Sequence, residues 1–575
     1  MPKRALSFLT LLILLLPVLA ACGGTPTPAA PTAAPAAGAT AAPAAGGRSD
    51  AVMTIGGAVG SAFQRNFNPF SPNSLIGTVN SAYEPLMILN SITGEVVPWL
   101  ATRYEFSADN QTLTFTIRDG VKWSDGQPLT ARDVAFTFNL LKNTPGLNST
   151  VLSALSGPTA YIDSITAPDD STVVFTFSRV YTPGVYELFV QNIVPAHIWK
   201  NVSDPAKFTN DNPVGSGPFT EVTNFQTQSY EIHRNPNYWQ EGKPAIKGIR
   251  FLAFPDRNAE SLAAVNGEID WSNTSISDPD QTFVARDPTN RYYISESGPN
   301  MACLALNIAK EPFDDVNVRK AISMAINREQ ISVVGENGVS PPADVTGLGP
   351  FYQAWKVADP ASLGDWTTYN PDKANQLLDA AGLAKGGDGI RVLPDGTPMK
   401  YTIPVLPLPN WLADMQIIAD NLRAVGIEVS PEPVQFPQWQ EAQQKGTYDM
   451  MFNIVDGNAT PYRFYYNTMS SALLEPVGTQ AFGNSTRYAG KKADDVLNQF
   501  ASTADPARQK EIIQQVQRVF AEEVPTLPLF PLSGRGFINT AHFTGFPTKE
   551  DHYASAQYNP FFADQLIVFT RVQPK

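Results

Sequence analysis

The sequence of 575 residues contains few of the side chains that carry covalent or metal chemistry, with two cysteines and four histidines. Only Cys303 stands in the part of the chain that has the composition of a folded domain, so an intramolecular disulfide is excluded there. No histidine has a partner at zinc-ligand spacing, and the motifs of phosphate loops, nucleophile elbows and dinucleotide-binding turns are absent. We therefore expect no metal, no cofactor and no catalytic residues, and we expect Cys303 to be a buried apolar side chain.

The sequence also has fewer basic residues than acidic ones. The chain has 41 Lys and Arg against 54 Asp and Glu, a formal net charge of −13. An acidic surface of this kind disfavours nucleic acid as a partner. The longest apolar run, from Phe8 to Leu19, is too short to predict a membrane-spanning helix. We expect an acidic, exported monomer.

The first fifty residues have the order of a secretory signal, in which Lys3 and Arg4 precede the apolar run and small residues follow it. The sequence Leu-Ala-Ala-Cys at residues 19–22 is similar to the lipobox of bacterial lipoproteins, in which cleavage precedes an acylated cysteine. We predict a signal peptide at residues 1–21 and lipid attachment at Cys22, which would hold the protein on the outer face of the cytoplasmic membrane. An ordinary signal peptide with an incidental cysteine is the alternative.

The segment after Cys22 is built from very few residue types. From Thr25 to Gly47 every residue is Ala, Pro, Thr or Gly, a composition that cannot pack a core and favours an extended, solvated chain. We predict that residues 22–49 form a tether between the membrane surface and the folded part of the protein.

The rest of the chain alternates between helix and strand patterns, which predicts α/β domains, and its length predicts two or three of them. Leu113, Phe115 and Ile117 alternate with polar residues as in a half-buried strand. Thr130 with Asp133 predicts a helix start, and further helices are predicted after caps at Asp314 or Asp315, at Asn370 and at Asp505. Other strand patterns occupy residues 172–177, 248–254, 301–308, 399–406, 427–434 and 448–455.

Several stretches together resemble the extracytoplasmic solute-binding proteins of ATP-binding-cassette importers, in the dipeptide- and oligopeptide-binding class called family 5. The stretch YEPLMILN…ARDVAFTF at residues 83–138 resembles the signature region of that family almost throughout. The other matching stretches are residues 214–222, 230–251, 313–331, 369–383 and 417–429. They follow the order of the family and spread over nearly the whole mature chain.

The resemblance implies an α/β, two-lobed periplasmic-binding-protein-like fold of type II, cluster C, with an extra inserted domain. By that resemblance, lobe I contains residues 50–90, 210–297 and 537–575, the inserted domain contains residues 91–209, and lobe II contains residues 298–536. The chain would cross between the lobes at hinges near Gly298 and Gly534. A solute would bind between the lobes, and the closed form would dock on the membrane permease of an importer.

The solute class depends on residues 448–471, where peptide binders of this family carry an aspartate that pairs with the ammonium group of the peptide. Aligned from Tyr448, that aspartate falls on Asn458, and Asp456 lies two residues earlier. Two positions along a strand shift a carboxylate by several ångströms, and a desolvated ammonium without a partner is costly. A neutral oligosaccharide is therefore favoured, an oligopeptide is the alternative, and a secreted hydrolase with a similar fold is a further one.

Flat aromatic rings and amides suit an oligosaccharide, and both occur around this stretch. The candidate ligand-binding residues are Trp411, Trp439, Asp456, Asn458, Tyr462, Phe464, Tyr465 and Tyr466. We expect at least half of these aromatic side chains to be core residues instead.

Overall fold

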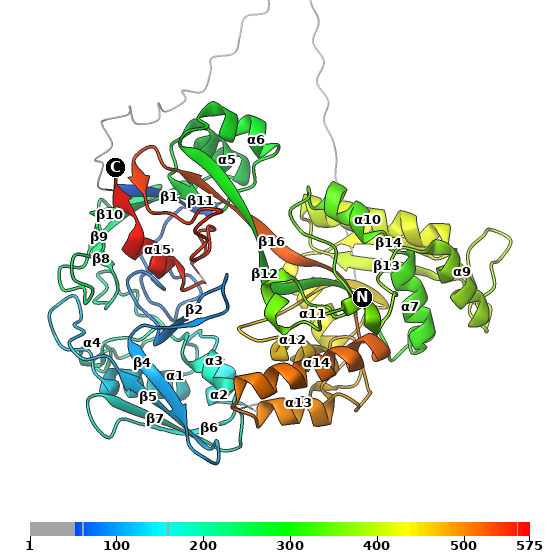
Figure 1. The fold of residues 1–575 in the computed structure, drawn as a ribbon, viewed down its shortest axis with the longest axis horizontal. Helices are drawn as coiled ribbons and strands as arrows, with labels where there is room; N and C mark the ends of the chain where they lie inside the picture. The colour runs from blue at the N-terminus through cyan, green and yellow to red at the C-terminus, as the bar shows by residue number, and fades with distance from the viewer. Residues whose placement is uncertain (1–51, 60–61, 158–159, 561) are drawn as a thin grey trace, which may run out of the picture. The chain divides into compact units, whose positions relative to one another are not determined.

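The computed structural model describes residues 52–59, 62–157, 160–560 and 562–575 (Figure 1). The predicted signal peptide, the predicted lipidation site Cys22 and the predicted tether lie outside these residues. Within the described ranges, no helix combines the length and the apolar character that crossing a membrane requires.

A four-stranded antiparallel sheet lies in the segment predicted as the inserted domain. Its strands, in spatial order, are β4 (Ala101–Phe106), β5 (Thr112–Ile117), β7 (Thr172–Phe177) and β6 (Ile162–Thr166). Alternate side chains of β5 are buried, as the sequence pattern predicts, because one face of the sheet packs against helix α1 (Ala131–Asn143).

The predicted helix starts are confirmed, because each depends on a local capping bond. At α1 the backbone N–H of Thr130 donates to the Asp133 carboxylate at 2.9 Å, as in a capping box. The other caps accept a backbone N–H at the start of α7 (Val316–Ala325), α9 (Pro371–Ala380) and α14 (Pro506–Glu523), and they are Asp315, Asn370 and Asp505.

The largest sheet has eight strands, drawn from distant parts of the chain. Their spatial order is β15 (Met450–Val455), β12 (Arg291–Leu306), β16 (Leu527–Asn539), β11 (Trp271–Ser272), β1 (Val52–Val59), β10 (Gly248–Phe254), β9 (Ser229–Arg234) and β8 (Phe219–Thr223). The antiparallel strands β12 and β16 have 16 and 13 residues, and they run together through the middle of the view in Figure 1.

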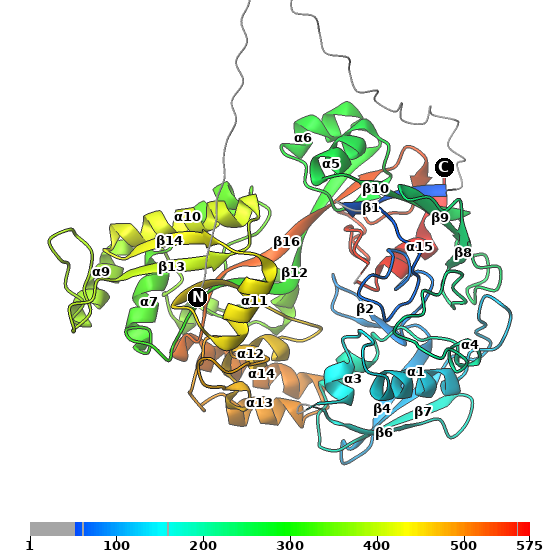
Figure 2. The ribbon, with the colours of Figure 1, turned by 180° about the vertical axis from the view of Figure 1, so that it is seen from behind.

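Three strand pairs complete the described sheets. Strands β13 (Lys400–Val405) and β14 (Glu428–Pro433) are parallel, and helix α10 (Pro409–Ala424), which connects them, lies along the pair (Figure 2). The two antiparallel pairs are β2 (Met87–Leu89) with β3 (Val96–Pro98) and β17 (Phe543–Thr544) with β18 (Gln573–Pro574).

The remaining α-helices are short, apart from α5 and α11. They are α2 (Leu152–Leu155), α3 (Gly184–Leu188), α4 (Ala196–Trp199), α5 (Arg257–Asn266), α6 (Pro279–Thr282), α8 (Arg328–Gln330), α11 (Phe436–Lys445), α12 (Tyr462–Met469), α13 (Asp494–Ala501) and α15 (Gln565–Arg571).

The buried apolar side chains gather into two large hydrophobic cores. The first core takes its members from residues 53–294 and 538–572, and the second takes them from residues 301–530. The segment predicted as the inserted domain shares the first core. The chain therefore passes from the first core to the second along β12 and returns along β16. The domain boundaries that the family resemblance implies remain predictions.

All six further strand patterns form strands, in β7, β10, the second half of β12, β13, β14 and β15. Strand β16 was not predicted at all, because Pro528 and Pro531 interrupt the run of strand-forming residues. In the structure the pairing of β16 with β12 is irregular next to both prolines. Proline lacks the N–H that a regular ladder needs, so irregular positions of this kind are where a strand can accept it.

Candidate functional site

The strands that connect the two cores lose their regular pairing at one point. Pairing runs as far as Ser297 with Ser533 and resumes at Met301 with Pro531, so three residues of β12 lie opposite one residue of β16. Gly298, a predicted hinge residue, lies inside this interruption. Gly534, the other predicted hinge residue, pairs with Glu296 just beside it. An interrupted ladder bends more easily than a regular one, which suits the hinge prediction.

Strand β15 ends next to the same interruption. Val455 pairs with Met301, and the backbone N–H of Gly457 donates to the Asn300 side chain at 2.9 Å. A Cβ at residue 457 would lie 2.3 Å from the Pro299 carbonyl oxygen, so only glycine allows this close approach. The predicted residues Asp456 and Asn458 are thereby held beside the connection between the cores.

Asp456 and Asn458 differ in how much of their bonding capacity is used within the protein. The Asn458 carbonyl accepts a hydrogen bond from the Tyr352 hydroxyl at 2.7 Å, and its side-chain oxygen accepts one from the Thr460 N–H at 3.2 Å. Asp456 is exposed, and it makes no hydrogen bond or ion pair with any other described residue. Its carboxylate is available to a ligand.

Asp456 lines a cavity of about 150 Å³. The walls come from the last residues of β15, from the end of α11, from Asn467 on α12 and from the segment 481–485. The polar side chains among these are Gln443, Gln444, Asn453, Asp456, Asn467, Asn484 and Ser485. Amide groups predominate, and among the described lining residues none carries a positive charge. The cavity can hydrogen-bond a polar, uncharged group, and its carboxylate can also accept from a cationic group.

Most of the predicted aromatic residues on α12 are core residues. Tyr462, Phe464 and Tyr465 are buried in the second core, where Tyr462 stacks on Phe500 with ring centres 4.9 Å apart. Burial raises the pKa of Tyr462 and of Tyr465, so both hydroxyls stay protonated. Tyr466 is half-buried and stacks on Tyr462. Of these four rings, only Tyr466 has substantial surface for a ligand in this structure.

The two predicted tryptophans both pack near Phe452 of β15. The Trp439 ring is buried, and its Nε1–H donates to the Phe452 carbonyl at 2.8 Å. Trp411 is half-buried, with its ring centre 4.9 Å from that of Phe452. Neither tryptophan lines the cavity beside Asp456.

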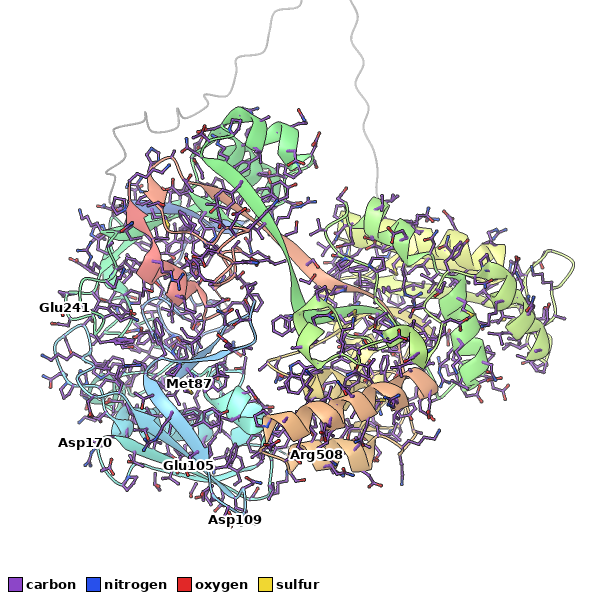
Figure 3. All side chains as sticks on the ribbon, viewed as in Figure 1. Met87, Glu105, Asp109, Asp170, Glu241 and Arg508 are labelled. Atoms are coloured by element: carbon purple, nitrogen blue, oxygen red, sulfur yellow. The ribbon has the colours of Figure 1, made fainter. Side chains whose placement is uncertain are left out.

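The two cores also meet away from β12 and β16. Tyr181 packs against both cores, and its ring centre lies 6.2 Å from that of Tyr462. The Thr182 N–H donates to the Ala501 carbonyl and the Thr182 hydroxyl to the Thr503 carbonyl, each at 2.8 Å. A hydrogen bond from Asn110 to Ser502 lies nearby. It joins the turn between β4 and β5, where Asp109 is labelled in Figure 3, to the residue that follows α13.

The structure describes Cys303 as a fully buried thiol, as predicted, and burial raises its pKa to about 12. A thiol of this kind is a packing group and not a nucleophile. Among the residues with described positions, no group of three or more His, Cys, Asp or Glu side chains could hold a metal ion.

The sequence reasoning missed most of the cavity. Gln443 and Gln444 belong to an ordinary amphipathic helix, and Phe482 and Ser485 lie in a segment without a recognisable pattern. Of the lining residues, only Asp456 was predicted, because it lies in the stretch 448–471 that is expected to determine the solute.

Comparisons with known proteins give a consistent picture. A sequence model described as bacterial extracellular solute-binding proteins, family 5 Middle, matches residues 95–473. The chain is 31% identical over 474 residues to a putative ABC transporter peptide-binding protein of Brucella ovis, a match that covers 80% of this chain and 84% of that protein. It is 28% identical over 479 residues to the nickel-binding periplasmic protein of Escherichia coli, with 81% and 86% covered.

A solved structure shows the same relationship in three dimensions. It is the mannohexaose-bound periplasmic oligopeptide-binding protein of an oligopeptide ABC transporter from Thermotoga maritima. It is 26% identical to this chain, with a TM-score of 0.73, and the match covers 92% of this chain and 99% of that one. The predicted α/β, two-lobed periplasmic-binding-protein-like fold is confirmed.

Proposed function

The chain belongs to the bacterial extracellular solute-binding proteins, family 5, and we propose that it is the receptor of an ATP-binding-cassette importer. The Brucella ovis relative is named as a peptide-binding protein of such a transporter, and the relatives described above are named for what they bind. A receptor of this kind captures a solute outside the membrane and delivers it to the permease. The proposal includes no catalytic role for any residue.

Solute capture in this proposal depends on motion between the two lobes. Strands β12 and β16 connect the two cores, and their pairing is interrupted at Gly298. Rotation about this point, and about the neighbouring Gly534, would close the lobes on a solute. The open and closed forms need to differ by only a few kcal/mol, because a solute that contacts both lobes shifts the population toward the closed form.

The solute that we propose is a neutral oligosaccharide. The observation that carries this choice is Asn458, an uncharged residue at the position where the family's peptide binders are expected to have an aspartate. The amide-lined cavity beside it can bind hydroxyl groups without a counter-charge. The solved Thermotoga maritima relative is bound to mannohexaose, which supports a solute of this class.

An oligopeptide is the second candidate, and two charged side chains favour it. Asp456 is exposed and unpaired, and the side chain of Arg463, on α12, makes no hydrogen bond or ion pair with another described residue, although its charge opposes the rise that burial causes in the pKa of Glu187. Together they offer one charge of each sign to the ends of a peptide. The names of the relatives point the same way.

Calorimetric titration of wild type and Asp456→Asn with manno-, xylo- and cello-oligosaccharides and with a peptide mixture separates the two candidates. If the solute is a neutral oligosaccharide, we expect the affinity of Asp456→Asn to stay within about fivefold of the wild-type affinity, since an amide also binds hydroxyl groups. A peptide ammonium that loses its charged partner would bind about thirtyfold more weakly or worse.

The matched control is Asp495→Asn, which removes an exposed carboxylate of α13 outside the cavity. If the wild type and Asp495→Asn bind peptide and Asp456→Asn does not, the proposal of a neutral oligosaccharide is refuted and the oligopeptide is established as the solute.

We also propose that the protein is exported and held at the membrane by lipid on Cys22, with residues 22–49 as the tether. The lipobox-like sequence at residues 19–22 supports this. The substitution Cys22→Ser should move the protein from the membrane fraction to the soluble fraction, which membrane fractionation detects. A variant that stays with the membrane would contradict lipid attachment at this cysteine.

A further inference from the structure

The cavity beside Asp456 has one wall of fixed amides and two polar groups that remain available. The Gln443 side-chain N–H donates to Asn453 at 2.5 Å, and the Asn453 side-chain N–H donates to the Ser485 hydroxyl at 3.0 Å. The side chains of Asp456 and Asn467 make no hydrogen bond with any other described residue. These two side chains face the cavity with their bonding capacity unused.

The unused groups select for a particular chemistry. The Asn467 amide both donates and accepts, and the Asp456 carboxylate only accepts. With a carboxylate present and no cation among the described lining residues, the cavity repels anionic groups. Hydroxyl groups donate to one side chain and accept from the other, so a polyhydroxy compound satisfies both.

An exposed aromatic ring stands at the same cavity. Phe482 is 72% exposed, the largest exposed fraction among the large apolar side chains that the structure describes. A Cβ at the neighbouring Gly483 would lie 2.6 Å from the Leu473 side chain and 3.4 Å from the Asn467 side-chain oxygen. Glycine therefore lets the chain that carries Phe482 lie close to Asn467. A flat apolar face beside hydroxyl-binding groups matches the two kinds of surface on a sugar ring.

From this arrangement we infer that the cavity is a subsite for one pyranose ring of the solute. Phe482 stacks on the C–H face of the ring, and Asp456 and Asn467 bind its hydroxyls. The inference rests on the proposed function, and it assigns the residues that hold one sugar unit.

The test is calorimetric titration of the purified protein with manno-, xylo- and cello-oligosaccharides, in wild type, Phe482→Ala and Phe436→Ala. We expect Phe482→Ala to weaken binding about tenfold or more, because a phenyl ring that a sugar covers is lost. The melting temperature should not change, since the ring is exposed. Phe436, on α11, is a matched control because it is 55% exposed and does not line the cavity. Phe436→Ala should bind as the wild type does.

The outcomes separate this subsite from the proposed function. If the wild type binds an oligosaccharide and Phe482→Ala binds it equally well, the subsite is refuted and the proposed function stands. If the wild type binds no oligosaccharide, the proposed solute and the subsite are refuted together. Weaker binding in both phenylalanine variants would also refute the assignment, because the effect would then be unspecific.

Discussion

Asp414 is an unusual residue because its carboxyl group is buried without a hydrogen-bond donor. It lies on α10 with no exposed surface, and neither of its oxygens accepts a hydrogen bond. It faces Glu336, which accepts bonds from Asn410 and Ser340 at 2.9 Å each. Burial, and then the charge of Glu336, raise the pKa of Asp414 to about 8. The group therefore keeps its proton at neutral pH and can donate it to Glu336.

The raised pKa of Asp414 predicts how stability depends on pH. The folded protein binds this proton more tightly than the unfolded chain, whose aspartates titrate near pH 4. The contribution to stability is complete below about pH 4 and is lost as the pH rises to about 8. The amide in Asp414→Asn cannot ionise, so the variant does not lose this contribution. Between pH 5 and pH 8.5 the melting temperature of the wild type should therefore fall by a few degrees more than that of Asp414→Asn.

Differential scanning calorimetry at the two pH values measures this difference. The control is Asp420→Asn, which removes an exposed carboxylate on the same helix and should follow the wild type. Equal pH dependence in the wild type and Asp414→Asn would show that Asp414 titrates normally.

At the residue level, the sequence indicates which side chains are unusual, and burial decides which of them a ligand can reach. Asn458 stood out because it replaces an expected charge, and Asp456 because it lies close by. Tyr462, Phe464 and Tyr465 belong to the same aromatic-rich stretch as Tyr466. Nothing in the local sequence distinguishes a ring that is buried in the second core from a ring at its edge. Helical position could not decide this, because the packing partners, such as Phe500 and Phe520, come from other helices.

At the level of elements, local signals predicted what local bonds determine. The helices α9 and α14 start where Asn370 and Asp505 supply a cap and the next residue is proline. The predicted strands have alternating or continuous apolar residues, which reflect burial on one face or both.

Strand β16 shows the limit of local signals. Its sequence LPLFPLSGRGFIN contains two prolines and two glycines, which favour a loop. It becomes a strand because β12, more than 220 residues earlier in the chain, supplies its hydrogen-bond partners. The cavity beside Asp456 has the same origin, since α11, β15, α12 and the segment 481–485 each contribute a part of its wall.

At the level of the whole molecule, the contact at Thr182 is a second connection between the two cores. Thr182 belongs to the segment that packs on the first core. Of its bonding partners, Ala501 is a member of the second core and Thr503 lies two residues further along the chain. Thr182 is 1% exposed, so its hydroxyl is satisfied only while the two segments touch. If the lobes separate when the solute leaves, this contact breaks, and it forms again on closure.

Thr182→Val therefore should weaken solute binding about fivefold, because closure no longer gains a hydrogen bond worth about 1 kcal/mol. Isothermal titration calorimetry measures the effect, with whichever oligosaccharide or peptide the wild type binds. Thr503→Val is the control, since the Thr503 hydroxyl donates to Gln499 within its own segment. A lower melting temperature with unchanged affinity in Thr182→Val would show that the contact persists in both states.

The central claim is that this member of family 5 is a receptor for a neutral oligosaccharide. Titration of the purified wild-type protein with manno-, xylo- and cello-oligosaccharides and with a peptide mixture tests it most directly. We expect saturable binding of at least one oligosaccharide, with stabilisation of about 2.7 kcal/mol when the solute is present at 100 times its dissociation constant. Tight binding of peptides with no response to any oligosaccharide would contradict it.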